Sequence, residues 1–396
     1  MEYEVRGVGS SPQPQGSMTI LSREELEFVD NKNNDFQNNY GSPFLSVIMK
    51  GISTCNLSCK YCDADTYSNQ RMDFKVLASV INKAQSYSRY IDYIWHGGEP
   101  TLLGIEFYKK VLYLQNYYKR EGQVISNGMQ TNGTLLDKEW VEFLIKNKFS
   151  VGISLDGPKI LNDINRIFKN GVGSFENILR TKELLEKAHI RFGVLAVITD
   201  DTLKIDPEEF LNFFIKNNIL NFGLNWQRPA FNLGRGDALN RNEYELFLIK
   251  LFDVWYDLEN PNIHIREFDS IVHAILGGKN SFCVLGGNCI GKYVGITPKG
   301  DIYHCDEFMF DDNYKLGNIL NNSFREILGN ENLILQKLKE NNSKQVENLQ
   351  CKYINICNGG CPKDRYTTIK TSGDVTCCGW SNIIDHAYKK VYNRLD

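Results

Sequence analysis

Short runs of β-branched and aromatic residues alternate with stretches of helical periodicity from Pro43 onward, a pattern typical of βα units that build a parallel sheet. We expect strands at Phe44–Met49, Tyr90–Trp95, Val124–Gln130, Phe149–Leu155, Arg191–Ile198 and Asn221–Trp226. We expect helices between them at Asp73–Tyr87, Ile105–Tyr118, Asp137–Lys146, Ser174–Lys187 and Pro207–Asn217, and another at Asn242–Asp257 after the last strand. Six such units predict an α/β fold with a partial (βα)6 barrel of the TIM type. Its active site should lie at the C-terminal ends of the strands.

Three regions follow from this pattern. Residues 1–41 comprise a segment through Met18 that resembles a flexible leader or cloning tag, then an extension with a short acidic helix around Ser22–Asp30 and an Asn-rich linker. Residues 42–265 form the partial barrel. In residues 266–396 the periodicity is lost after about Phe268, and eight of the eleven cysteines lie between Cys283 and Cys378. We expect a loop-rich domain that metal clusters stabilise, followed by a C-terminal helix.

Charge and apolar content exclude several classes of protein. A formal net charge of −3 and a pI near 6.1 provide no basic field for nucleic acid or acidic lipid. No run approaches the roughly 18 apolar residues of a membrane span, and the polar N-terminus lacks the apolar core of a signal peptide. We therefore expect a cytoplasmic protein with no nucleic-acid or membrane partner. In that reducing compartment, clustered cysteines are metal-ligand or catalytic candidates rather than disulfides.

Cys55, Cys59 and Cys62 lie directly after the first expected strand. Three close thiolates can hold three corners of a four-iron cube and leave the fourth iron open, and a zinc site or a coincidental grouping is the alternative. The Cys-x3-Cys-x2-Cys spacing, with the aromatic Tyr61 before the last cysteine, resembles the motif of the radical S-adenosylmethionine (SAM) superfamily. The resemblance implies that SAM chelates the open iron of a [4Fe-4S] cluster. Electron transfer then cleaves SAM to a 5′-deoxyadenosyl radical, which abstracts a substrate hydrogen.

Segments after the next three strands also resemble SAM-binding segments of the superfamily. In His96-Gly97-Gly98-Glu99-Pro100, glycines without side chains let a ligand approach the backbone carbonyls closely, although a simple turn is the alternative. The resemblance implies that SAM is bound by Tyr61, Gly97, Gly98, Glu99, Pro100, Gln130, Asn132 and Ser154. It also implies an arginine that pairs with the SAM carboxylate through a bidentate fork. Arg180 is our first candidate and Arg166 the second, with a solvated helix arginine as the alternative.

The remaining cysteines resemble the SPASM extension of radical SAM enzymes, which carries two auxiliary [4Fe-4S] clusters. The resemblance assigns one cluster to Cys283, Cys289, Cys305 and Cys361, and the other to Cys351, Cys357 and Cys378. The family usually has a further cysteine where this chain has Asn348. Cys377 can replace that ligand, or one iron can remain open. A zinc ribbon is the alternative for the whole region, but paired Cys-x2-Cys knuckles are lacking.

From Phe44 to the C-terminus the chain is similar to anaerobic sulfatase-maturating enzymes and to maturases of ribosomally made peptides (RiPPs). Sulfatase maturases oxidise a cysteine or serine to formylglycine, and their general base corresponds to Asp306, although a loop aspartate can also simply cap a turn. Asp63-Ala64 and His96 depart from the sulfatase maturases, which have an aromatic pair and a glutamine there. Because His96 is closer to the peptide maturases, we expect a radical SAM oxidoreductase that installs a thioether or carbon–carbon crosslink, or another oxidation, in a ribosomal peptide.

Two other functions stay open. One is a sulfatase maturase, and the other, of a different class, is a non-catalytic iron–sulfur electron carrier. The expected partners are a precursor peptide or protein substrate and an electron donor such as flavodoxin or ferredoxin. The segment Asn225–Pro229, with Trp226 and Arg228, faces the expected cavity and is a candidate peptide contact, although packing of Trp226 in the core explains it equally well.

Overall fold

The computed structural model describes residues 20–31, 40–62, 64, 68–228, 239–280, 282–372 and 377–393. The expected leader through Met18, the Asn-rich linker, Asp63 and Pro229 lie outside these residues.

Ten strands form one sheet in the order β10-β9-β8-β1-β2-β3-β4-β5-β6-β7. The strands are β1 (Ser42–Met49), β2 (Ser88–Trp95), β3 (Val124–Thr131), β4 (Ser150–Ser154), β5 (Phe192–Ile198), β6 (Asn221–Trp226), β7 (His264–Ile265), β8 (Tyr293–Ile296), β9 (Asp301–His304) and β10 (Lys315–Asn318). From β1 to β7 the pairs are parallel and follow chain order. The six predicted strands and the α/β partial-barrel class are therefore confirmed.

Aspartates mark the starts of several predicted helices. The side chain of Asp73 accepts the backbone N–H of Val76 at 2.8 Å, and that of Asp137 accepts the N–H of Trp140 at 2.9 Å. Both therefore act as N-caps. The α-helices are α1 (Arg23–Asn31), α2 (Phe74–Tyr87), α3 (Ile105–Tyr117), α4 (Lys138–Lys146), α5 (Lys159–Asn165), α6 (Phe175–Lys187), α7 (Pro207–Lys216), α8 (Arg241–Asp257), α9 (Arg266–Ile275), α10 (Cys283–Gly286), α11 (Phe324–Leu328), α12 (Leu333–Glu347), α13 (Ile354–Cys357), α14 (Pro362–Ser372) and α15 (Ser381–Tyr392). The described residues also include the short 3-10 helices η1 (Pro100–Leu103), η2 (Thr202–Lys204) and η4 (Asp312–Tyr314).

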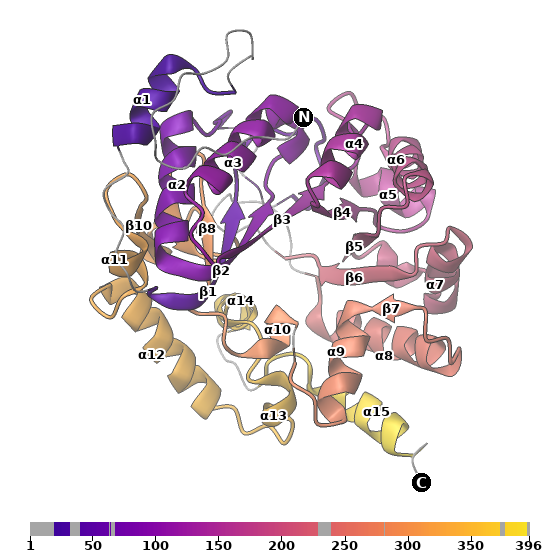
Figure 1. The fold of residues 1–396 in the computed structure, drawn as a ribbon. Helices are drawn as coiled ribbons and strands as arrows, with labels where there is room; N and C mark the ends of the chain where they lie inside the picture. Colours follow the sequence, from indigo (N-terminus) through magenta and orange to yellow (C-terminus); the bar gives the residue numbers. More distant parts are fainter. Residues whose placement is uncertain are drawn as a thin grey trace.

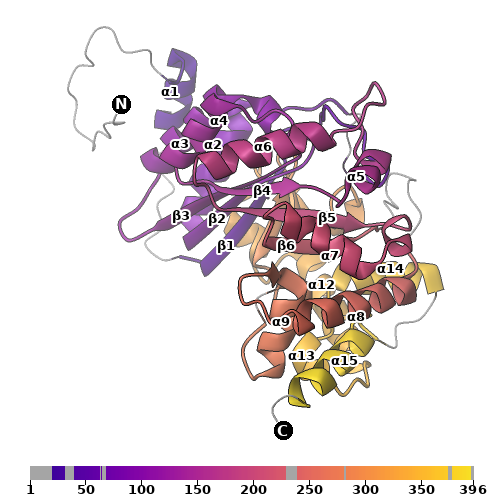
Figure 2. The same ribbon diagram turned by 90° about the vertical axis from the view of Figure 1, so that its right-hand side faces the viewer.

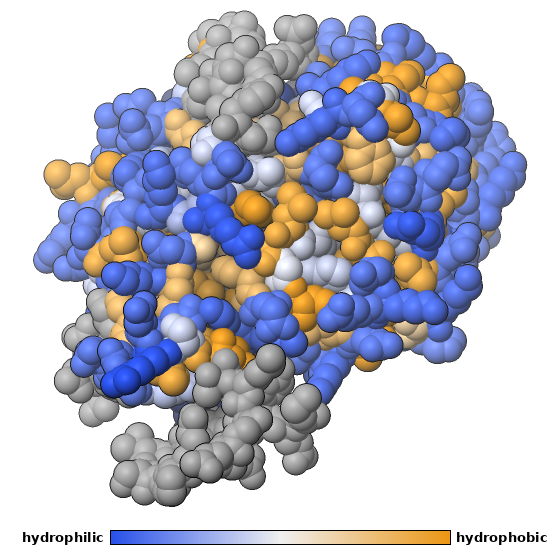
Figure 3. Space-filling model, turned by 90° about the horizontal axis from the view of Figure 1, so that it is seen from above, coloured by the Kyte–Doolittle hydropathy of each residue, from blue (hydrophilic) through white to orange (hydrophobic). Residues whose placement is uncertain are grey.

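Several barrel helices lie on the side of the sheet away from the C-terminal helices, whereas α8 packs against α15. Figures 1 and 2 both place α3, α4 and α6 opposite α12, α13 and α15. The helices bury one face each: α4 buries Trp140, Val141, Phe143 and Leu144 and exposes charged residues. From above, hydrophilic residues dominate the surface and hydrophobic ones form scattered patches (Figure 3). Among the described helices, none combines the length and hydrophobicity that crossing a membrane requires.

The described part of the region after Phe268 holds six of the α-helices and three strands, in addition to most of α9. Its strands are only four residues long and contain glycines such as Gly295 and Gly317, so they lack a visible period of two. α12 is mostly polar and buries only Leu335 and Leu338, so its helical period is weak in the sequence. The expected C-terminal helix is confirmed as α15.

The C-terminal region contacts the partial barrel at both edges of the barrel. At one edge, β8 pairs in parallel with β1 and extends the sheet. The Lys83 ammonium on α2 also donates to the carbonyl of Asn322 at 3.0 Å. At the other edge, the carboxylate of Glu245 on α8 accepts the backbone N–H of Asn382 at 2.8 Å, at the start of α15. The strand ends therefore face the cysteine-rich region.

Candidate active site

The first three cysteines lie on a loop that leaves the C-terminal end of β1. This loop is held against the connection between α5 and α6: the Ser58 N–H donates to the Ile167 carbonyl at 2.7 Å, and Leu57 forms an isolated β-bridge with Phe168. Cys55 is buried, whereas Cys59 and Cys62 are partly buried. The sequence predicted a trio at this end of the strands, and the structure places it there.

The chemistry of this donor set fits an iron–sulfur cluster. Burial raises the pKa of Cys55 to about 11, and it raises the pKa of Cys59 to about 12, although Arg166 opposes the rise at Cys59. The negative charge of Cys62 contributes to both increases, so the three thiols are electrostatic neighbours. Burial therefore disfavours the thiolates, and bound iron would compensate their charge. No three His, Cys, Asp or Glu side chains in the described chain are close enough together to ligate a single metal ion.

The His96–Pro100 loop follows β2 and packs directly on the cysteine loop. Gly98 has φ +50°, and a Cβ there would lie 2.7 Å from the carbonyl oxygens of Ile52 and Ser53. Only glycine fits this approach. The carboxylate of buried Glu99 accepts the Thr101 N–H at 3.0 Å, the Thr131 hydroxyl at 2.6 Å and the Asn132 N–H at 2.8 Å.

Glu99 therefore joins the ends of β2 and β3. Burial raises its pKa, although these hydrogen bonds oppose the increase. Pro100 begins η1, and its carbonyl accepts the Tyr108 hydroxyl at 3.1 Å. Glu99 and Pro100 thus shape the loop, while Gly98 lets it pack against the backbone of Ile52 and Ser53.

The predicted SAM contacts on β3 and β4 lie at the same end of the sheet. The Gln130 amide donates to the Ser154 hydroxyl at 3.1 Å. The Asn132 amide lies 3.7 Å from the Cys55 sulfur and donates to the Asn56 side chain at 2.9 Å. The structure thus places Asn132 against the cysteine loop and pairs Gln130 with Ser154.

Asp156 is a residue near these side chains that the sequence analysis did not single out, although it lies only two positions after Ser154. Its carboxylate accepts the Tyr61 hydroxyl at 2.6 Å and the Val197 N–H at 3.0 Å, and it lies 3.0 Å from the Arg166 Nε. The Arg166 guanidinium also lies 5.4 Å from the centre of the Tyr61 ring. Between the two candidate arginines the structure favours Arg166, because Arg180 is exposed on α6.

The first auxiliary set is brought together from distant segments. Cys283 begins α10, Cys289 follows it, Cys305 comes directly after β9 with φ +62°, and Cys361 directly precedes α14. Cys283 interacts electrostatically with Cys289, and Cys305 with Cys361. The Cys289 sulfur is 3.8 Å from the His304 Nε2.

Asp306 lies between this set and the barrel. Its Oδ1 is 3.1 Å from the Cys305 sulfur. Burial alone would raise the pKa of Asp306, but the charges of Lys50 and His96 outweigh burial and lower it. Lys50 and His96 directly follow β1 and β2, so this carboxylate faces the C-terminal ends of the barrel strands.

The four candidate cysteines of the second auxiliary set lie near one another. Cys351 interacts electrostatically with Cys357 and Cys377, and the Cys378 thiol hydrogen-bonds to both Cys357 and Cys377. Hydrogen bonds from Cys378, Ser381 and Gly379 lower the pKa of Cys377 to about 4. The hydrogen bonds that Cys378 makes to Cys357 and Cys377 raise the pKa of Cys378 itself.

The Trp226 segment contributes to packing between the two regions. Trp226 is buried, and the Arg241 guanidinium lies 4.7 Å from its ring centre. Arg228 forms ion pairs with Glu307 at 2.9 Å and Asp364 at 2.8 Å. Core packing therefore accounts for Trp226.

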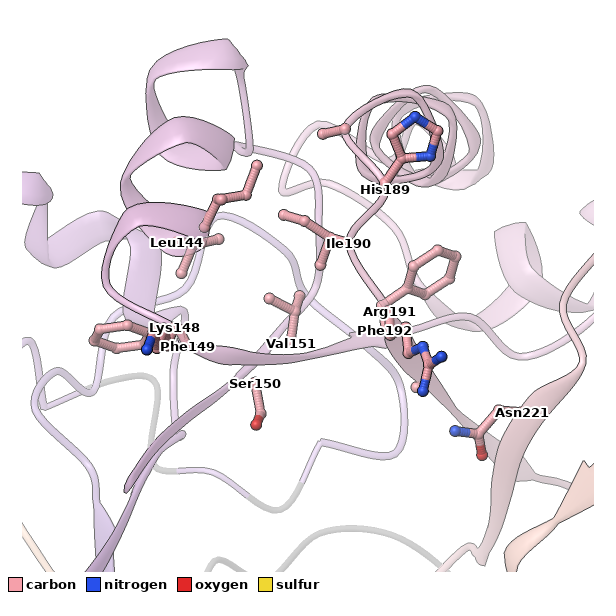
Figure 4. Close-up of a pocket in the computed structure, with 13 residues that line it drawn as sticks. Leu144, Lys148, Phe149, Ser150, Val151, His189, Ile190, Arg191, Phe192 and Asn221 are labelled. Carbon is pink, nitrogen blue, oxygen red and sulfur yellow. The ribbon is translucent and has the colours of Figure 1, made fainter. Parts of the chain in front are cut away.

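A cavity of about 420 Å³ lies at the opposite end of the sheet. Ser150, Phe192 and Asn221, the first residues of β4, β5 and β6, line it together with His189 and Arg191 (Figure 4). Active sites of such barrels lie at the C-terminal ends of the strands, so this cavity is separate from the candidate site.

Comparison with known proteins gives two family matches. The radical SAM superfamily matches residues 49–214, and the SPASM iron–sulfur cluster-binding domain matches residues 283–362. A cysteine-type anaerobic sulfatase-maturating enzyme of Clostridium perfringens (strain ATCC 13124) is 32% identical over 368 residues, which cover 89% of this chain and 98% of the relative.

Two solved structures illustrate the range of similarity. Native anSMEcpe with bound AdoMet and Cp18Cys peptide has a TM-score of 0.78 and 31% identity, covering 89% of this chain and 97% of that chain. Streptococcus suis SuiB bound to S-adenosylmethionine has a TM-score of 0.58 and 18% identity, covering 90% and 80% of the two chains. The second likeness concerns the fold alone.

Proposed function

The chain belongs to the family of radical SAM/SPASM enzymes that includes the anaerobic sulfatase-maturating enzymes, and from this premise we propose that it oxidises a cysteine or serine side chain of a peptide or protein substrate. The relative whose structure holds a peptide supports a peptide as the substrate class. The single observation that carries the proposed chemistry is Asp306, a carboxylate between the auxiliary cysteines and the ends of β1 and β2.

The chain's own residues would bind SAM and its cluster at the C-terminal ends of the barrel strands. Cys55, Cys59 and Cys62 would ligate the cluster, while the Gly97–Gly98 backbone and Arg166 lie where SAM would bind. When bound, SAM and its cluster supply a 5′-deoxyadenosyl radical that removes one hydrogen atom from the substrate carbon.

Asp306 would remove the accompanying proton from the substrate thiol or hydroxyl. Because Lys50 and His96 lower its pKa, the carboxylate is charged at neutral pH and ready to accept a proton. The hydrogen atom takes one electron from the substrate, and the proton takes none. Removal of one further electron completes a two-electron oxidation. The auxiliary cysteines beside Asp306 would hold the iron–sulfur acceptor for that electron.

A crosslinking maturase is the second candidate, and two observations favour it. His96 and Ala64 stand where the sulfatase maturases have other residues, and His96 interacts with Asp306. Both candidates begin with hydrogen abstraction from a peptide. They differ in whether the oxidised carbon becomes an aldehyde, for cysteine after water replaces the sulfur and hydrogen sulfide leaves, or forms a new bond.

The test uses the anaerobically reconstituted enzyme with peptides that carry cysteine, serine or alanine at one position. We expect 5′-deoxyadenosine and an oxidised peptide from the cysteine or serine peptide, and no oxidation at the alanine. An aldehyde-reactive probe labels formylglycine, whereas a crosslink suppresses fragment ions between the joined residues. Formation of 5′-deoxyadenosine with every peptide left unmodified would contradict both candidates.

The base is tested by Asp306→Asn, with the exposed Asp312→Asn as the matched control. We expect the first variant to lose about 100- to 10,000-fold in peptide oxidation while it still cleaves SAM, because only proton removal is impaired. The control should keep the parent rate. An Asp306→Asn variant that oxidises peptide at the parent rate would show that this carboxylate is not the base.

A further inference from the structure

Four cysteines from two separate segments meet beside the start of α15. Cys357 ends α13 and Cys351 lies three residues before this helix, while Cys377 and Cys378 precede α15. Cys351 interacts with Cys357 and Cys377, and Cys378 hydrogen-bonds to Cys357 and Cys377. The four sulfurs are therefore linked by pairwise interactions within one group.

The backbone allows two adjacent cysteines to take part in the same set. Cys377 and Cys378 lie in a bend rather than in a helix or strand, and Gly379 follows with φ +80°. Gly360 packs against Cys378 so closely that a Cβ on Gly360 would lie 2.7 Å from the Cys378 Cβ. Gly360 therefore contacts Cys378 on one side, and the neighbouring Cys377 remains partly exposed.

The Cys377 sulfur lies against the segment that begins α15. Its sulfur accepts the Gly379 N–H at 3.3 Å and hydrogen bonds from Ser381. Ser381 is the first residue of α15, so the sulfur lies at the positive end of a twelve-residue helix. Hydrogen bonds of this kind orient metal ligands and stabilise their charge. By contrast, Asn348, at the C-cap of α12, is exposed and offers no sulfur.

We propose that Cys377 is the fourth protein ligand of the second auxiliary four-iron cluster and completes a set with Cys351, Cys357 and Cys378. This inference rests on the proposed presence of that cluster. Each cysteine binds as a thiolate, so its proton is released to solvent as the sulfur–iron bond forms, and no electron is transferred. All four irons then have a protein ligand, which leaves this cluster no open position for substrate and restricts it to electron transfer.

Differential alkylation of the full reconstituted enzyme is the first test. Iodoacetamide is added anaerobically before and after iron is removed by chelation, and each cysteine-containing peptide is quantified by mass spectrometry. We expect Cys377 to be protected in the holoenzyme, as Cys351, Cys357 and Cys378 are, and to react at least about tenfold faster after iron removal. Equal alkylation of Cys377 in both states, with the other three protected in the holoenzyme, would overturn the assignment.

The second test compares Cys377→Ala with Ser381→Ala by iron content and electron paramagnetic resonance. Three four-iron clusters predict about twelve iron atoms per chain in the parent, and Cys377→Ala should lose about one and give a three-iron signal. Ser381→Ala should retain the parent iron content, because it removes only a hydrogen bond. A Cys377→Ala spectrum and iron content identical to the parent's would refute the proposal. Neither test uses a peptide, so its failure is distinguishable from failure of the proposed function.

Discussion

Asp156→Asn is expected to destabilise the protein strongly, because it removes the charge that compensates buried Arg166. The side chain of Asp156 is 1% exposed and that of Arg166 is 9% exposed, and their ion pair spans 3.0 Å. An asparagine is nearly the same size, but its amide group must face either the guanidinium or the Tyr61 hydroxyl. The change therefore leaves the cation buried without its partner.

The magnitude follows from this burial. Breaking a buried ion pair by neutralising one partner typically costs about 3–5 kcal/mol, whereas changes at exposed surface positions are usually within about 0.5 kcal/mol. Glu183→Gln is the matched control, since the Glu183–Lys187 pair spans 3.7 Å and its side chains are 61% and 75% exposed. Tyr61→Phe removes one hydrogen bond to the same carboxylate and should cost about 1.5–3 kcal/mol.

The assay is anaerobic urea unfolding of the reconstituted enzyme, followed by circular dichroism, with iron content as a second measurement. We expect the free energy of unfolding to fall in the order Glu183→Gln, Tyr61→Phe, Asp156→Asn. Iron content should also fall in Asp156→Asn, since Tyr61 lies between two cluster cysteines. If Asp156→Asn were no more destabilising than Glu183→Gln, the argument from a buried charge would be refuted.

Three further predictions concern the shape of the site and the domain that faces it. Tyr108→Phe should cost about 0.5–1.5 kcal/mol near neutral pH, because it removes a buried hydrogen bond. Burial raises the pKa of Tyr108 in the folded protein above the value of about 10 that tyrosine has in the unfolded chain. The stability that Tyr108 contributes is therefore present below about pH 10 and is lost as the pH rises above it. Urea unfolding at several pH values would reveal this loss. Gly98→Ala should abolish SAM binding, measured by equilibrium dialysis, because its Cβ would meet the Ile52 and Ser53 carbonyls at 2.7 Å; unchanged affinity would contradict this close approach. Removing iron by chelation should speed amide hydrogen exchange between residues 283 and 378 more than in β1 to β6, since cluster ligation contributes to the folding of that region; a uniform change would argue against this.

Local patterns in the sequence were sufficient to predict much of this architecture. The six barrel strands and their helices follow from residue periodicity and from caps such as Asp73 and Asp137, which act over one or two turns. The region after Phe268 was harder to predict, because its four-residue strands and the polar α12 carry little periodicity. The pairing of β8 with β1 joins segments far apart in the chain, and no local signal encodes it.

The sequence by itself determined which residue types are available to the site: the cysteine trio, the glycines after β2 and the carboxylate at position 306. Only the tertiary structure decided which of several equivalent residues lie close to one another. Arg166 and Arg180 offer the same guanidinium, but only Arg166 meets the buried Asp156 beside Tyr61. Cys377 joins the last cysteine set because α15 and the turn before it pack beside Cys351 and Cys357. The physical reason is that spacing along a chain limits local reach, whereas burial and charge pairing depend on what folding brings close.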